Sequence, residues 1–425
     1  MTRCLGDLYK NSFFLIMSTL LNAGFGFFFW IIASRMYPIR DVGFATVLIS
    51  SLGLIILFSR FGFDISIIRF FPVYDKTKVF NTSLLLTSVL SIIAAIIGVL
   101  LISFLTPNAS FIKYPVLVFL FILICIMNSA ALITGNTFTA NRRADFYFYQ
   151  NILLAFRIPF LIPLMFLGSF GILGSLGLAY FIASVFAILI LKKFHIIINL
   201  RVDREFLRNS VRYSLYNYVS NILSAAPALI LPLIVSNMLG ETEAAKYYIA
   251  YTVGNLVLII PSALSTSLLV EGSYGTKLRK DAIKSGAAIF ALLVPSVILM
   301  SFFGKLILGL FNRDYIDAFE LLRILTLSSF LVALYSIFIP IQNVRMMIES
   351  IVGLNLLRFV LLLGLSYILI LRYGILGVGY AWTITYMIID LIIIGILRKE
   401  LGFMQFIRLI VVKYYAIIRV VFSFR

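Results

Sequence analysis

Histidine and cysteine are almost absent from this sequence. Its 425 residues include one histidine, His195, and two cysteines, Cys4 and Cys125. A structural zinc site needs about four such ligands, and a Ser-His-Asp triad needs a histidine beside its nucleophile. Cys4 lies in a short amino-terminal tail and Cys125 inside an apolar run, which excludes a disulfide framework. We therefore expect no metal site, no cofactor and no enzyme activity.

Charged residues are equally scarce. They make up 12% of the chain, against 62% hydrophobic residues, whereas soluble domains are about a quarter charged and about half apolar. Runs of about 20 apolar residues, the length that crosses a bilayer core of about 30 Å, recur from end to end. The first run is too long for a signal peptide and is expected to be retained. The sequence therefore predicts an all-α integral membrane protein.

Twelve apolar runs divide into two sets of six on either side of the polar stretch 192–212. They fall near residues 11–33, 42–61, 80–105, 115–137, 148–167, 172–191, 213–238, 245–270, 282–303, 318–339, 351–371 and 375–397. We expect twelve transmembrane helices in two six-helix bundles, residues 1–200 and 201–400. Residues 401–425 form a basic, apolar tail that we expect at the inner membrane surface.

Basic residues outnumber acidic residues by 35 to 17, for a formal net charge of +18. Nucleic-acid binding is one explanation, but membrane proteins keep excess lysine and arginine in their cytoplasmic loops. With the amino terminus inside, the inner segments hold about 25 of these residues and the outer loops about 7. We therefore predict a multi-pass plasma-membrane protein with both termini in the cytoplasm and no nucleic-acid partner.

The two halves share a weak internal repeat. A shift of 202 positions places Ser12 on Ser214 and Met36 on Met238. Six helices separate the copies, so the copies have the same orientation, which predicts parallel repeats about an axis along the membrane normal with a cavity between the bundles. A polar stripe at helical spacing recurs in both copies and is predicted to line that cavity: Ser12, Thr19, Asn22, Ser214, Asn217, Asn221 and Ser224. Packing of small polar residues between helices is the alternative.

Arginines within the apolar runs are the strongest candidates for a binding site, because a charge at mid-membrane costs about 2.5 to 3.5 kcal/mol. Arg157 and Arg358 lie about halfway along runs that the repeat relates to each other. Two guanidiniums suit a diphosphate, since each donates paired hydrogen bonds and stays charged. Pairing with backbone carbonyls, or snorkelling to the interface, is the alternative.

Four other charged residues are candidates with simpler alternatives. Arg60 and Asp64 have the i, i+4 spacing of an ion pair and are predicted to gate the inner mouth of the cavity. Arg323 follows two acids closely, which favours a local ion pair. Asp390 either binds a coupling proton or monovalent cation, or pairs near the interface with Arg398.

Several segments resemble the polysaccharide-transporter branch of the multidrug/oligosaccharidyl-lipid/polysaccharide exporter superfamily, the repeat-unit or O-antigen flippases. They are Asn11-Ser12, Ser34-Arg35-Met36-Tyr37-Pro38, Val42-Gly43-Phe44-Ala45, Phe61-Gly62-Phe63 with Ile67-Ile68-Arg69-Phe70, and Leu310-Phe311-Asn312-Arg313-Asp314-Tyr315 running into Leu321-Leu322-Arg323-Ile324-Leu325. The family usually has glycine at Asn312.

The resemblance implies twelve helices in two bundles and alternating access that moves a polyprenyl-diphosphate-linked oligosaccharide to the outer leaflet for surface polysaccharide biosynthesis. Its expected partners are this lipid-linked glycan, membrane lipids and a coupling cation or proton. Related lipid II flippases carry arginines in their first, second and eighth helices, and the first and eighth runs here have none at mid-depth. This difference argues against lipid II as the substrate. Arg157, Arg358 and Arg60 then remain as the candidates for binding the diphosphate.

Two other functions remain open. A drug or organic-cation exporter of the same superfamily would need buried acids, whereas the intramembrane charges here are mainly basic. A membrane glycosyltransferase would need carboxylates or a metal near a large outer loop, and the outer loops are short.

Overall fold

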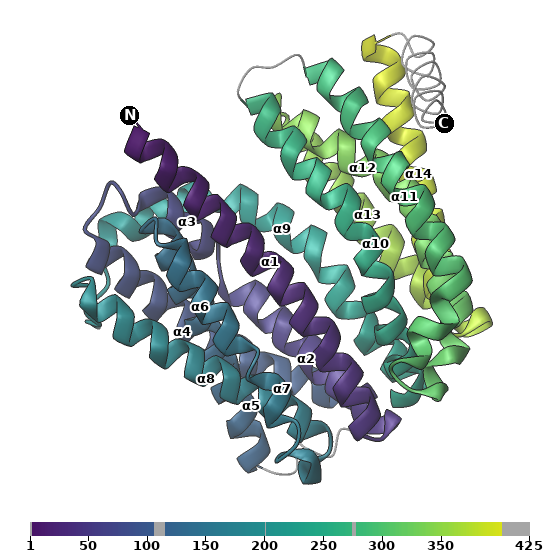
Figure 1. Cartoon of the computed structure of the whole chain (residues 1–425), viewed down its shortest axis with the longest axis horizontal. Helices are drawn as coiled ribbons and strands as arrows, with labels where there is room; N and C mark the ends of the chain where they lie inside the picture. Colours follow the sequence, from purple (N-terminus) through teal and green to yellow (C-terminus); the bar gives the residue numbers. More distant parts are fainter. Residues whose placement is uncertain (1, 106–114, 200, 274–277, 402–425) are drawn as a thin grey trace. The chain divides into compact units, whose positions relative to one another are not determined.

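The computed structural model describes residues 2–105, 115–199, 201–273 and 278–401. These residues form helices and short connections, with no β-strand within the described ranges (Figure 1). Contacts divide the chain into two compact units, Met1–Ala245 and Lys246–Arg425. The all-helical class expected from the sequence is confirmed.

Unit 1 contains the first helices of the chain. They are α1 (Thr2–Met36), α2 (Ile39–Ser59), α3 (Phe63–Phe70), α4 (Lys76–Leu105), α5 (Pro115–Ala140), α6 (Ala144–Leu154), α7 (Arg157–Phe160), the 3-10 helix η2 (Met165–Leu167), α8 (Ser169–Lys193), α9 (Arg204–Leu239) and the start of α10 (Glu241–Ser273). The central helix is α2, which packs against α4, α8 and α9, while α1 runs along α6 and α7.

The packing around α2 shows how these helices associate without water. Leu48, Leu52 and Ile55 of α2 are buried with Phe121 of α5 and Leu173 of α8. Lipid tails are as apolar as these side chains, so close packing rather than the hydrophobic effect holds the helices together.

Small residues bring two helices close to α2. A Cβ atom at Gly43 would lie 1.8 Å from the backbone oxygen of Glu241, and one at Gly53 would lie 2.8 Å from Leu229 of α9. Glycine at these two positions therefore allows α9 and the start of α10 to approach α2.

Unit 2 contains most of α10, followed by α11 (Leu278–Gly309), η3 (Arg313–Ala318), α12 (Phe319–Val344), α13 (Ile348–Tyr373) and α14 (Leu376–Leu401). In this unit α14 packs against α12 and α13, and α11 packs against α12. A buried cluster joins Val257 of α10, Ile289 and Leu293 of α11, and Ala333 of α12.

Eleven helices of the described chain are long and apolar enough to cross a membrane. They correspond to eleven of the twelve predicted spans. The remaining run, 148–167, is not one helix, because it is divided into the end of α6, the short helix α7 and η2. Pro159 and Pro163 lack the backbone N–H of a regular helix, and Gly168 ends the segment with φ 55° and ψ −134°. The predicted span over 148–167 is therefore not a continuous helix.

The connection before the last helix of each predicted half uses the same backbone conformation. Gly168 precedes α8 at φ 55° and ψ −134°, and Gly374 precedes α14 at φ 57° and ψ −142°. This region is accessible mainly to glycine. The contact boundary at Ala245 differs from the predicted repeat boundary near residue 200 because α9 packs against α2. The parallel repeat of residues 1–200 and 201–400 stays a prediction.

Candidate functional site

Arg157 lies at the break in the interrupted segment. Backbone bonds of the tight i to i−3 type replace helical ones here, including Ala155 N to Ile152 O at 3.0 Å and Ile158 N to Ala155 O at 2.9 Å. Arg157 is partly buried as the first residue of α7. Its guanidinium carbon lies 5.5 Å from the centre of the Phe29 ring in α1, within the range of a cation–π contact.

Gly26 provides the space for this contact. A Cβ atom at Gly26 would lie 3.7 Å from Nη2 of Arg157. Gly26 precedes Phe29 by about one turn of α1, so one face of α1 forms the surface on which the guanidinium rests. Arg157 is thus positioned by α1 and by the break that follows α6.

Arg60 and Asp64 form the ion pair that their spacing predicts. Nη1 of Arg60 lies 3.7 Å from Oδ2 of Asp64, with side chains 30% and 15% exposed. The chain reverses between them through Phe61 at φ 43° and Gly62 at φ 78°. Asn136 of α5 donates to the backbone oxygen of Asp64 at 3.4 Å. The pair therefore fixes the corner between α2 and α3.

Burial and pairing act on this ion pair in opposite directions. Burial lowers the pKa of Arg60, while the nearby Asp64 carboxylate raises it. Burial raises the pKa of Asp64, while the Arg60 guanidinium and a backbone N–H lower it. Each partner thus compensates the cost of placing the other away from water.

Tyr180 of α8 connects these two arginines electrostatically. Its hydroxyl lies within the field of both the Arg157 and the Arg60 guanidiniums. Sequence reasoning missed Tyr180, although a tyrosine within the apolar run 172–191 is a visible signal. Two of the three arginines that the sequence predicted for substrate binding therefore lie in unit 1 within electrostatic range of one tyrosine.

The third arginine, Arg358, is enclosed in unit 2. It lies on α13 and is 7% exposed. Nη1 donates to the Tyr386 hydroxyl of α14 at 3.1 Å, and the guanidinium carbon lies 5.0 Å from the Tyr335 ring centre in α12. The Tyr335 hydroxyl in turn donates to Asn355. Phenol groups from two neighbouring helices thus contact this cation.

The predicted polar stripe has a mixed environment. Thr19, Asn221 and Ser224 are exposed, whereas Asn22 is partly buried and donates to Oδ1 of Asn151 in α6 at 2.5 Å. The Asn22 bond fits the alternative of packing between helices. The side chains of the other three stripe residues, Ser12, Ser214 and Asn217, lie outside the described part of the chain. The cavity-lining role of the stripe stays a prediction.

Asp390 lies one turn after Tyr386 on α14. It is 8% exposed, and its Oδ1 accepts no hydrogen bond within the described part of the chain. The side chain of Arg398 lies outside that part, so the predicted pairing stays a prediction.

Arg323 forms a local ion pair, as its neighbours in sequence indicate. Its Nη1 lies 3.7 Å from Oε2 of Glu320. Asp317, the second nearby acid, instead pairs with Lys246 at 3.2 Å. Arg323 is more than half exposed, which separates it from the buried arginines.

The described residues contain no cluster of three or more His, Cys, Asp or Glu side chains that could hold a metal. In unit 1 the polar groups are two guanidiniums, a phenol, an amide and the Asp64 carboxylate, and in unit 2 they are a guanidinium, two phenols, an amide and the isolated Asp390 carboxylate. Such groups bind and orient anions and sugars through charge and hydrogen bonds.

Known proteins with a similar fold are membrane transporters. The lipid II flippase MurJ in an inward closed conformation is similar over 97% of this chain and 93% of its own, with a TM-score of 0.71 and 15% identity. An inward-facing multidrug resistance transporter of the MATE family, in the MOP superfamily, is similar over 92% of this chain and 95% of its own, with a TM-score of 0.65 and 17% identity. At these identities the likeness establishes the fold.

Sequence comparison identifies the family. A putative O-antigen transporter of Shigella flexneri is 27% identical over 173 residues, 39% of this chain and 41% of that protein. The aligned part therefore spans about two-fifths of this relative. The profile of the polysaccharide biosynthesis protein family matches residues 8–270. This match covers more than half of the present chain. The chain therefore belongs to the polysaccharide biosynthesis protein family.

Proposed function

We propose that this protein is a flippase that moves a polyprenyl-diphosphate-linked oligosaccharide to the outer leaflet by alternating access. The observation that carries the proposal is the pair of arginines inside unit 1 of a chain from this family. Arg157 and Arg60 both act on Tyr180, and Asp64 is the acid paired with Arg60. Guanidiniums in a site shielded from water suit a diphosphate headgroup.

Arg157 and Arg358 differ in the groups that surround their guanidiniums. Arg157 rests on the Phe29 ring, and its planar guanidinium has the shape for bidentate contact with phosphate oxygens. Arg358 donates a hydrogen bond to Tyr386, so binding there requires the phosphate to join or displace a phenol. We assign contact with the diphosphate to Arg157, Arg60 and Arg358.

The alternative is an exporter of drugs or organic cations, which is the function named for the MATE relatives of similar fold. A cationic cargo requires buried carboxylates, and Asp390 is one such buried carboxylate. Three arginines against this single isolated acid favour the anionic cargo. Asp390 is then the candidate for coupling to a proton or monovalent cation. The protein makes and breaks no covalent bond in this scheme.

The proposal places the protein in the plasma membrane with both termini in the cytoplasm. Exposed basic residues gather at the end of unit 1 where α4 and α9 begin and α8 ends, including Lys76, Lys78, Lys192, Lys193 and Arg204. The positive-inside rule directs such an end to the cytoplasm.

A deletion and complementation experiment tests this function. Removing the gene should abolish surface polysaccharide and leave lipid-linked oligosaccharide on the inner leaflet, and a plasmid copy should restore both. Susceptibility to cationic drugs, measured on the same strains, should not change. Normal surface glycan together with increased drug susceptibility would instead establish the exporter.

A further inference from the structure

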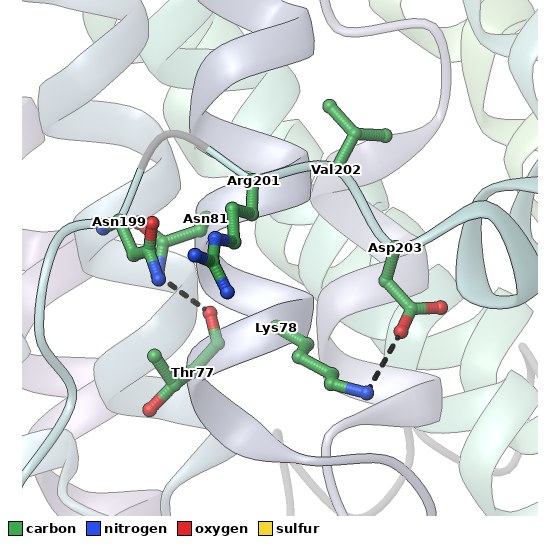
Figure 2. A pocket seen from close by; sticks show the side chains of 7 residues that line it. All are labelled: Thr77, Lys78, Asn81, Asn199, Arg201, Val202 and Asp203. Carbon is green, nitrogen blue, oxygen red and sulfur yellow. Dashed lines mark hydrogen bonds and ion pairs between the residues drawn. The ribbon is translucent and has the colours of Figure 1, made fainter.

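A pocket opens where the connection between α8 and α9 crosses the first turns of α4. Its volume is about 280 Å³, and it is lined by Thr77, Lys78, Asn81, Asn199, Arg201, Val202 and Asp203 (Figure 2). The first three residues belong to α4 and the others to the connection. None of them belongs to the transport site proposed above.

Buried hydrogen bonds fix one wall of the pocket. Asn81 is 4% exposed. Its amide nitrogen donates to the backbone oxygens of Thr77 at 2.7 Å and Ile197 at 2.8 Å, and its Oδ1 accepts from the backbone N–H of Asn199 at 2.6 Å. One side chain thus ties the connection to α4. The pocket is therefore preorganised rather than formed by chance contact of surface side chains.

A second set of bonds fixes the other wall. The backbone N–H of Asp203 donates to Oγ1 of Thr82 at 2.9 Å, and the Asp203 carboxylate caps α9 by accepting from the N–H of Phe206 at 2.9 Å. This cap, reinforced by Lys78, lowers the pKa of Asp203 and keeps it ionised. Lys78 lies 3.3 Å from the carboxylate, so these two charges compensate each other.

Lys78 and Asp203 compensate each other, so Arg201 gives the pocket its net positive charge. It is exposed, and within the described part of the chain its guanidinium forms no ion pair with an acidic side chain. Figure 2 shows its side chain extending from the connection toward the first turns of α4, beside Asn81 and Lys78. A guanidinium beside the Lys78 ammonium and the Asn199 amide can donate several hydrogen bonds to phosphate oxygens.

The connection also carries exposed apolar side chains, of which Val202 lines the pocket. Ile197, Ile198 and Val202 are 56%, 44% and 38% exposed. Exposed basic residues stand nearby in sequence, with Lys192 and Lys193 before the connection and Arg204 after it. Basic groups mixed with exposed apolar side chains at the end of a helix bundle are typical of the lipid interface, where anionic headgroups gather.

We propose that this pocket binds the phosphate ester of an anionic phospholipid, with Arg201 as the principal donor and with Ile197, Ile198 and Val202 against the acyl chains. The bound lipid would tie the connection between the two predicted halves to the membrane surface. Free inorganic phosphate shares the same recognition chemistry, so the experiment separates the two sources.

Binding is measured on the purified full-length protein in neutral detergent, with fluorescent phosphatidylglycerol and fluorescent phosphatidylcholine as probes. Phosphatidylglycerol should bind more tightly. Arg201→Gln should weaken its binding about fivefold, the effect of one basic residue near an anionic surface. Arg204→Gln removes another exposed charge, outside the pocket, and is the matched control. Thermal unfolding of each variant verifies that it is folded.

Competition by inorganic phosphate shows whether the bound phosphate group comes from a lipid or from solution. Binding of phosphatidylglycerol that resists phosphate and depends on Arg201 supports a lipid site. Displacement by phosphate to the same extent, still dependent on Arg201, supports a phosphate site filled from solution. Equal affinity of the wild type and Arg201→Gln, or an equal loss in Arg204→Gln, would overturn the proposal, because binding would then follow general surface charge.

Discussion

The hydroxyl of Tyr37 donates a 2.7 Å hydrogen bond to the backbone oxygen of Leu161. Tyr37 lies in the corner between α1 and α2 and is 3% exposed, and Leu161 directly follows α7. A carbonyl freed by a helix break has no water to bond in a membrane, so a side chain must satisfy it. Tyr37 therefore holds the interrupted segment in which Arg157 begins α7.

Tyr37→Phe should destabilise the protein by about 1 to 2 kcal/mol, because the Leu161 oxygen stays buried without its donor. Thermal unfolding in detergent measures this loss. Tyr149→Phe, which removes the hydroxyl of an exposed tyrosine in α6, is the control. Equal stability of wild type and Tyr37→Phe would show that the bond contributes nothing.

The contribution of the Tyr37 hydrogen bond to stability should depend on pH. Burial, with a smaller contribution from Asp41, raises the pKa of Tyr37 to about 12. A raised pKa favours the protonated form in the folded state. The contribution of Tyr37 should therefore be full below the ordinary tyrosine pKa of about 10 and disappear as the pH rises through about 12. The stability difference between wild type and Tyr37→Phe, measured against pH, should follow this course.

Replacing either Arg157 or Arg358 by lysine should reduce transport while preserving charge, because a lysine lacks the bidentate fork. Loss of one hydrogen bond to a charged group costs about 1.5 to 3 kcal/mol, or about 10- to 160-fold in transport rate. Surface glycan in a complementation assay, normalised to protein in the membrane, measures the effect. Full activity of a normally expressed Arg157→Ala, Arg358→Ala double variant would remove both residues from the mechanism.

The two arginines should differ in their effect on stability. Arg358 is buried between Tyr335 and Tyr386, so Arg358→Ala removes packing and a hydrogen bond together. Arg157 is only partly buried, so Arg157→Ala should unfold at a temperature closer to that of the wild type. Comparing thermal unfolding of the two single variants separates loss of fold from loss of substrate contact.

Arg60→Gln should change the pH dependence of stability through Asp64. Burial already raises the pKa of Asp64, and removing the guanidinium that opposes this shift raises it further. A carboxyl with a raised pKa stabilises the fold below its ordinary pKa, and this contribution is lost as the pH rises through the folded value. Arg60→Gln should therefore lose stability with rising pH, over a range that extends higher than in the wild type.

Adding Asp64→Asn to Arg60→Gln removes the titrating group and serves as the control for that experiment. The double variant should show a flatter profile of melting temperature against pH. Identical profiles for Arg60→Gln and the double variant would mean that Asp64 is not the group responsible.

Gly43→Ala should impair folding severely, because its Cβ atom would lie 1.8 Å from the backbone oxygen of Glu241, and backbone cannot move aside as a side chain can. Overpacking of this kind costs about 1 to 3 kcal/mol or more. Gly174→Ala is the matched control, since its Cβ atom would make an ordinary 3.5 Å contact with Leu164. Protein abundance in the membrane should fall for the first variant alone.

Hydrophobic run length predicted eleven spans well, because a membrane helix must present apolar side chains over its whole crossing. It did not predict the break in the run 148–167, since apolarity is unaffected when backbone hydrogen bonding changes. Pro159, Pro163 and Gly168 were the visible signals of that break.

The ion pair of Arg60 with Asp64 could also be predicted, because the two residues are close in sequence, although the corner at Phe61 and Gly62 rather than a single helix places them. The partners of Arg358 could not be predicted from the sequence. Tyr335 and Tyr386 lie on two other helices, and their contact depends on how each helix is rotated in the bundle. The same reason kept Tyr180 out of the predicted site.

The interrupted segment has a consequence for membrane topology. Eleven continuous crossings are an odd number, and by themselves they would leave the first and last described helices starting and ending on opposite sides of the bilayer. With both termini in the cytoplasm, as we propose, α6, α7 and η2 together must make the remaining crossing. Under this proposal the orientation of every later helix depends on the insertion of the short, proline-broken stretch in which Arg157 begins α7.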